Sequence, residues 1–261
     1  MSRWSSANKV AIVITIGGAL ISSAVWLGSR VHAAPTKTVV TVTATTRPSY
    51  GEATTIVLDV DVTASVTAAF VRQAQHAFAA AVVRIVRDGQ GPIRVYLRVI
   101  SHSSGSDAAA VATYTIPAVP TCSNNPFDLR CRRAHDAALA NAHARARMIA
   151  TNIEQLHLKR TSTGTALRGA FAAAGQLLVD AQGRRWLVAA TDLRPSNAPP
   201  STENIDLHGV RVVILFACEQ SIAQCQSRRA YWDAELRRDG ASTVAFLTPQ
   251  QSDLLFAGGG N

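Results

Sequence analysis

Three oxygen-bearing side chains stand at every second position near residue 60, namely Asp61, Thr63 and Ser65. They follow residues 54–60, a run rich in β-branched and apolar side chains that predicts a strand. In an extended segment, alternate side chains point to the same side, so one carboxylate and two hydroxyls can converge. Oxygen ligands of this kind suit Mg²⁺, or alternatively Mn²⁺ or Ca²⁺. The spacing therefore predicts a metal site where this strand ends.

Two later segments place similar side chains at the ends of other predicted elements. Gly164-Thr165 precedes a helical pattern, and the apolar run Trp186–Ala190 leads directly into Thr191-Asp192. A continuous apolar run is typical of a central strand that is buried on both faces. Polar side chains that follow such strands lie where ligands bind in open α/β sheets, beyond the carboxyl ends of the strands. We therefore expect Thr165 and Asp192 near Asp61.

The elements that must position these residues alternate between strand and helix patterns along the chain. Strands are predicted at residues 54–60, 93–100, 109–116, 186–190, 210–217 and 243–247, and helices at 66–85, 131–158, 167–178 and 228–238. In the strand at 93–100, Arg94, Tyr96 and Arg98 are predicted to form one exposed face. The alternation predicts an α/β fold, a single doubly wound and mainly parallel sheet with helices on both faces.

The chain at this point resembles the von Willebrand factor A (VWA) domain family, which includes the inserted domains of integrins. The family pattern is an apolar strand ending in D-x-S-x-S, a later Thr in a Gly-Thr turn before a helix, and an apolar strand ending in Thr-Asp. The resemblance spans residues 54–247 and implies a metal-ion-dependent adhesion site. It implies that Asp61, Thr63, Ser65 and Thr165 hold a divalent cation and that Asp192 acts mainly through water. One open coordination position would then receive an Asp or Glu of a protein partner.

The chain departs from the family pattern at three places. Thr63 replaces the commoner Ser and keeps the hydroxyl. Leu193 stands where the family usually has Gly, which predicts a differently shaped loop after Asp192. Asp59 adds a second carboxylate on the face of Asp61, either beside the metal or as a ligand in another register. A structural alternative is that the three hydroxyl side chains cap helices.

Two other functions fit the same residues. Asp59-Val60-Asp61-Val62-Thr63 looks like the first motif of haloacid-dehalogenase-type phosphatases, in which the first Asp attacks phosphate and Mg²⁺ neutralises it. Lys159 is a poor candidate for the later Lys of that family, and Asp192 has no acidic neighbour. The other alternative is a metal-free scaffold component of a cell-envelope complex. No catalytic residue is assigned, and the chain is expected not to be an enzyme.

The N-terminal residues predict attachment to a membrane. Val10–Leu27 contains 18 residues without a charge and follows Arg3 and Lys9, which suits a bilayer span or a signal peptide. The predicted organisation is a basic cytoplasmic segment at 1–9, an anchor or signal peptide at 10–29 and a Thr-rich tether at 30–53, then a domain at 54–250 and a flexible tail at 251–261. The main domain is expected outside the cytoplasm, or secreted after signal cleavage.

The four cysteines form two closely spaced pairs, Cys122 with Cys131 and Cys218 with Cys225. Neither pair has the C-x-x-C spacing of a zinc knuckle, and we expect two local disulfides in an oxidising compartment. This expectation agrees with the predicted extracytoplasmic domain.

The net charge of +9 raises nucleic acid and anionic membranes as partners. Part of the charge flanks the apolar segment, and residues 130–160 hold seven basic side chains against Asp136 and Glu154. This helix has a mixed, solvated face that does not suit DNA reading. Nucleic acid is therefore not expected as a partner, whereas anionic lipid or an envelope polymer is.

Overall fold

The computed structural model describes residues 49–87, 89–101, 110–122, 128–160, 164–194, 204–218 and 220–256. They belong to one compact unit, Thr46–Asn261. The predicted anchor at residues 10–29 and most of the predicted tether lie outside the described residues. Of the helices in these described ranges, none is long and apolar enough to cross a membrane.

The described residues form a six-stranded sheet with helices around it, as the alternating sequence pattern predicts. The strands are β1 (Thr54–Asp61), β2 (Ile93–Ile100), β3 (Ala112–Ile116), β4 (Arg184–Thr191), β5 (Arg211–Phe216) and β6 (Thr243–Leu247). The helices are α1 (Ala68–Arg84), α2 (Leu129–Gln155), α3 (Leu167–Val179) and α4 (Ile222–Arg238), followed by the short 3₁₀ helix η1 (Pro249–Leu254). The strand order is β3-β2-β1-β4-β5-β6. All neighbouring strands are parallel except β3, which is antiparallel to β2.

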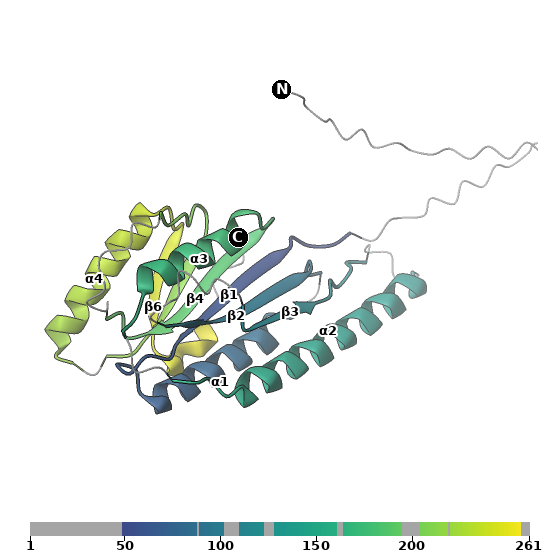
Figure 1. Ribbon diagram of the computed structural model, residues 1–261. Helices are drawn as coiled ribbons and strands as arrows, with labels where there is room; N and C mark the ends of the chain where they lie inside the picture. The colour runs from purple at the N-terminus through teal and green to yellow at the C-terminus, as the bar shows by residue number, and fades with distance from the viewer. Residues whose placement is uncertain are drawn as a thin grey trace, which may run out of the picture. The chain divides into compact units, whose positions relative to one another are not determined.

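The sheet separates two hydrophobic cores because alternate side chains of each strand point to opposite faces. Ile56, Leu58 and Val60 of β1 pack with α1 and α2, whereas Val57 packs with α3 and α4. In Figure 1, α1 and α2 lie below the sheet, α3 lies above it, and α4 lies at the left beside β6. The prediction of helices on both faces is confirmed.

One side chain of β2 lies in surroundings that its sequence pattern did not predict. Arg98 was expected on an exposed face, but it is only 1% exposed. Helix α3 covers that face of the sheet, and Nη1 of Arg98 donates a hydrogen bond to the carbonyl oxygen of Ala170 at 3.1 Å. The prediction of an exposed Arg98 is therefore wrong, because a strand inside a doubly wound sheet is covered on both sides.

The last helix and the C-terminal segment extend beyond the predicted elements. Helix α4 begins at Ile222, several residues before the expected start, and the Ser221 hydroxyl caps it by accepting a bond from the Gln224 amide. After β6 the chain forms η1, and both Leu255 and Phe256 are buried in the core that contains α1. The packed domain thus continues to Phe256 and includes the first part of the expected tail.

Both cysteine pairs lie at disulfide distance. The Cα atoms of Cys122 and Cys131 are 5.8 Å apart, and those of Cys218 and Cys225 are 6.1 Å apart. The pairing predicted from the spacing is therefore geometrically satisfied. The first pair joins the segment after β3 to the first turn of α2, and the second joins the segment after β5 to the first turn of α4.

Candidate functional site

The predicted site residues gather at the carboxyl ends of β1 and β4. These strands are neighbours in the sheet, with Val60 beside Ala190 in the register. The chain leaves β1 toward α1 and β2 on one side, whereas β4 is followed in the sheet by β5 on the other side. Ligands in open α/β sheets bind in the crevice that such a reversal of strand order creates.

Asp61, the last residue of β1, is completely buried, and both of its carboxylate oxygens accept hydrogen bonds. Its Oδ1 accepts from the backbone amide of Thr63 at 2.9 Å and from the Thr63 hydroxyl at 2.6 Å. Its Oδ2 accepts from the Thr191 hydroxyl, on the neighbouring strand, at 2.8 Å. Burial raises the pKa of the Asp61 carboxyl, and the hydrogen bonds from Thr63 and Thr191 oppose this rise.

Three hydroxyl groups from two separate loops converge beside this carboxylate. The Thr63 Oγ1 lies 3.2 Å from the Ser65 Oγ and 2.8 Å from the Thr165 Oγ1. Thr165 comes from the loop before α3, 102 residues away in the sequence from Thr63. Thr63 and Thr165 are buried, whereas Ser65 is half-buried. The structure therefore brings Asp61, Thr63, Ser65 and Thr165 into one cluster of oxygen atoms.

Helix capping does not explain this cluster. The N-terminal cap of α1 is Thr67, whose hydroxyl accepts a bond from the Phe70 amide at 3.2 Å. The residue at the N-terminus of α3 is Ala166, and no side chain caps that helix. Thr63, Ser65 and Thr165 therefore do not cap a helix: Thr67 caps α1, and no side chain caps α3.

Asp192 joins the cluster from the end of β4. Its side chain interacts with the Ser65 hydroxyl, and its Oδ1 accepts from the Arg194 amide at 3.0 Å. The Arg194 Nε lies 3.1 Å from the other carboxylate oxygen. Burial raises the pKa of Asp192, and the bonds and charges from Arg194, Ser65 and Arg228 oppose the rise. Asp192 is thus close enough to take part in the site, but it is also held by an arginine.

Leu193, which follows Asp192, adopts a backbone conformation that is usual for glycine. Its φ angle is +56°, in the left-handed region that favours glycine. The side chain is completely buried, the Leu193 amide donates to the Thr191 hydroxyl at 3.0 Å, and its carbonyl accepts from the Trp232 indole at 3.2 Å. These contacts hold a conformation that costs about 1–2 kcal/mol for a residue with a side chain.

Arg160 was not predicted from the sequence, although it ties together the two loops that form the site. Its Nη2 is within donor distance of the carbonyl oxygens of Thr63, Ala64 and Val66. Arg160 itself belongs to the segment that leads to Thr165. One guanidinium group therefore holds the loop after β1 against the loop before α3. No local sequence pattern signals such a contact.

Asp59 does not reach the cluster. It lies two residues before Asp61 on the same face of β1, directly beside Arg98 in the register. Its side chain is completely buried, and Oδ2 is 3.7 Å from Nη1 of Arg98. Burial raises the pKa of Asp59 to about 6, against the opposing charge of Arg98. The structure thus places Asp59 in an ion pair beneath α3, separate from the hydroxyl groups.

The donor set fits a small, hard cation. The described residues contain no group of three or more His, Cys, Asp or Glu side chains suited to a metal. A metal at this site would instead use the carboxylate of Asp61 and the hydroxyls of Thr63, Ser65 and Thr165. Such all-oxygen sets, completed by water, are those that Mg²⁺ and Ca²⁺ take.

Comparisons with known proteins give a weak structural similarity and no family match. No family model matches the chain, and no curated protein matches it. Among solved structures, it is similar to the crystal structure of the human COPII-coat protein Sec24c, with 14% sequence identity and a TM-score of 0.39. The match covers 77% of this chain and 30% of that chain.

Proposed function

We propose that the protein is a membrane-anchored, extracytoplasmic binding module of the VWA type. In this proposal, a bound divalent cation, Mg²⁺ in the first place, contacts an acidic group of a protein partner. The observation that carries the proposal is the convergence of oxygen atoms from Asp61, Thr63, Ser65 and Thr165 at the point where strand order reverses. When bound, the cation supplies a positive charge that a partner carboxylate can coordinate.

The residues of the chain have distinct tasks in this proposal. Asp61, Thr63, Ser65 and Thr165 would hold the cation, and Asp192 would act through water. Thr191 orients Asp61 by donating to its Oδ2. Residues that orient a metal ligand through a hydrogen bond commonly raise the affinity of the site for the metal.

The electrostatic surroundings favour an acidic partner. Arg160 lies against the loop after β1, Arg194 lies beside Asp192, and Nη1 of Arg228 donates to the Asp192 carbonyl at 2.8 Å. These guanidinium groups attract a negatively charged partner and repel a basic one. The exposed arginines of α2 offer a separate contact for anionic lipid or an envelope polymer, as the sequence predicts.

No observation favours the phosphatase alternative. Its nucleophile would be Asp59, which is completely buried under α3 and faces Arg98. A phosphate ester could not reach that carboxylate without displacing the helix. The extracytoplasmic location draws support from the two cysteine pairs at disulfide distance.

A pull-down from envelope extract tests the proposal directly. The full wild-type chain is immobilised once in buffer with Mg²⁺ and once in buffer with EDTA. The Thr165→Val variant is immobilised in buffer with Mg²⁺. We expect a partner that is retained only by the wild-type chain with metal and is released by an excess of a poly-glutamate peptide. Thr113→Val, on the exposed side of β3, serves as the matched control and should retain the partner. Equal retention in EDTA would contradict the proposal and favour the metal-free scaffold.

Removing the guanidinium of Arg160 is expected to weaken metal binding without unfolding the domain. In Arg160→Ala the carbonyl groups of the loop after β1 lose the bonds from this guanidinium, so the Kd for Mn²⁺ should rise by about 10- to 100-fold. Isothermal titration calorimetry measures this change. Lys159→Ala removes the neighbouring exposed charge and should bind Mn²⁺ as the wild-type chain does. Similar Kd values for the two variants would show that Arg160 has no positioning role.

A further inference from the structure

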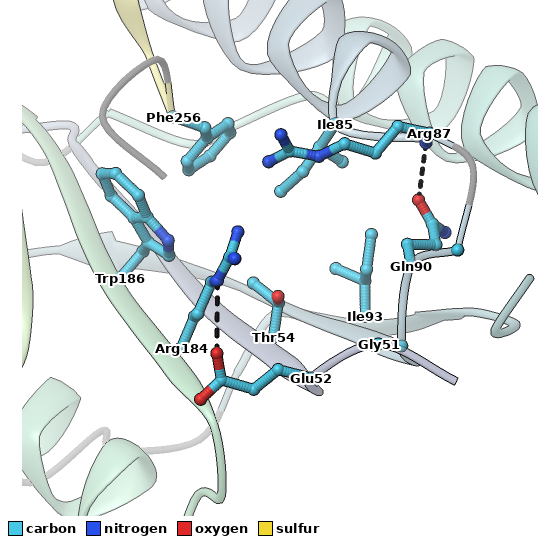
Figure 2. A pocket seen from close by; sticks show the side chains of 12 residues that line it. Gly51, Glu52, Thr54, Ile85, Arg87, Gln90, Ile93, Arg184, Trp186 and Phe256 are labelled. Carbon is cyan, nitrogen blue, oxygen red and sulfur yellow. Dashed lines mark hydrogen bonds and ion pairs between the residues drawn. The ribbon is translucent and has the colours of Figure 1, made fainter. Parts of the chain in front are cut away.

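A cavity lies at the opposite end of the sheet from the candidate metal site. It has a volume of about 190 Å³ and lies at the amino ends of β1, β2 and β4, beside the end of α1. Its lining includes Gly51, Glu52 and Thr54 and the turn at residues 89–91. Figure 2 shows the side chains that surround it. None of the residues discussed for the metal site lines this cavity.

The apolar part of the lining comes from segments that are far apart in the sequence. Ile85, Ile93, Trp186 and Phe256 are buried side chains with only a small exposed fraction each. The rings of Trp186 and Phe256 meet edge to face, with centroids 5.2 Å apart. Phe256 has a φ angle of +67°, which is unfavourable for a residue with a side chain. The chain thus holds Phe256 in a strained conformation that presents its ring to the cavity.

The polar part of the lining carries an excess of positive charge. The guanidinium groups of Arg87 and Arg184 enter the cavity from opposite sides (Figure 2). Arg184 is paired through Nε with Glu52 at 3.3 Å, which leaves its two terminal amino groups for another acceptor. Among the described residues, the Arg87 guanidinium has no hydrogen bond or ion pair. The Arg87 backbone is bound to Gln90: its amide donates to the Gln90 Oε1 at 2.8 Å, and its carbonyl accepts from the Gln90 amide at 3.4 Å. Within the part of the chain that the structure describes, the Arg87 guanidinium therefore has no counter-charge.

We propose that this cavity binds a small aromatic carboxylate. Its ring would lie against Trp186 and Phe256, where aromatic pairs gain more than their buried area alone provides. Its carboxylate would take the two donors of a guanidinium in the planar, paired geometry that arginine favours. A neutral aromatic compound offers the Arg87 guanidinium no carboxylate, and inorganic phosphate makes no contact with the aromatic rings. The volume admits one ring and one acidic group.

Calorimetric titration of the full chain with benzoate, benzamide and inorganic phosphate tests this inference. Benzoate should bind with a Kd in about the millimolar range, which is typical of so small a ligand, and the other two should bind at least about tenfold more weakly. Arg87→Gln should weaken benzoate binding by about tenfold or more, because a charge-assisted bond is lost. Phe256→Leu should weaken it as well.

Arg72→Gln is the matched control, because it removes an exposed guanidinium from the other end of α1 and should leave benzoate binding unchanged. EDTA and Asp61→Asn should also have no effect, so the result is independent of the proposed metal site. The inference would be overturned if benzamide or phosphate bound as tightly as benzoate. It would also be overturned if benzoate did not bind at about 10 mM, or if Arg87→Gln bound benzoate as the wild-type chain does.

Discussion

Replacing Arg98 by methionine is expected to lower the free energy of unfolding by about 3–5 kcal/mol at pH 7. Arg98 and Asp59 are both almost inaccessible to solvent, with 3.7 Å between Nη1 and Oδ2. Removing one partner of a buried ion pair leaves the other charge without compensation in a medium of low polarity. Urea unfolding followed by circular dichroism measures the loss. In Asp59→Leu/Arg98→Met both charges are gone, so stability should return to about the wild-type value or exceed it.

The sign of the pH dependence follows from the raised pKa of Asp59. The folded protein holds the proton up to about pH 6, whereas the unfolded chain releases it near 3.8. The free energy of unfolding should therefore fall as the pH rises through this window, by roughly 3 kcal/mol for this one fully buried group. Arg98 lowers the pKa of Asp59, so Arg98→Met should extend the fall to higher pH. The double variant should lack this part of the pH dependence. If Arg98→Met were as stable as the wild type at pH 7, the ion pair between Arg98 and Asp59 would not stabilise the fold.

The Asp61→Asn variant is expected to lose metal-dependent stabilisation and yet be at least as stable as the wild type in EDTA. Burial raises the pKa of Asp61, which means that the charged carboxylate is costly in the folded protein without a cation. A neutral amide of the same shape avoids that cost. With Mg²⁺ at about 100 times its Kd, the wild type should gain about 2.7 kcal/mol and the variant nothing.

Thermal unfolding with and without Mg²⁺ measures this difference. Asp136→Asn is the matched control, because it neutralises an exposed carboxylate of α2 and should keep the metal-dependent shift. If Asp61→Asn gained the same stabilisation from Mg²⁺ as the wild type, the cation would be bound elsewhere. If Asp61→Asn were strongly destabilised in EDTA, the main role of Asp61 would be to stabilise the fold.

Most of the fold could be predicted from local patterns, and the exceptions have physical causes. The strand at Ile93–Ile100 alternates clearly and was placed correctly. Its Arg98 was misassigned because alternation reports one buried face and cannot show that a helix covers the other. The first turns of α4 were missed because that helix buries only Trp232, Glu235 and Leu236. Ser221 followed by Gln224 is a cap signal that could have revealed its start.

The site could be predicted only in part, for a similar reason. Asp61, Thr63 and Ser65 share a local spacing, and Asp192 follows a recognisable buried strand, so their proximity follows from the fold. The contact of Arg160 with the loop after β1 joins residues more than 90 positions apart. This contact depends on the tertiary arrangement of the two loops, which a local sequence pattern does not predict. Leu193 likewise adopts a glycine-like backbone only because Thr191, Trp232 and the core hold it.

A titration of the full chain with Mn²⁺, compared between the wild type and Thr165→Val, tests the proposed metal site most directly. Valine has nearly the shape of threonine but lacks the hydroxyl that lies 2.8 Å from the Thr63 Oγ1. Electron paramagnetic resonance of free Mn²⁺ should show one bound ion per wild-type chain and a large loss of affinity in Thr165→Val. Absence of binding at millimolar Mn²⁺, or equal binding by both chains, would contradict a metal site built from these four residues.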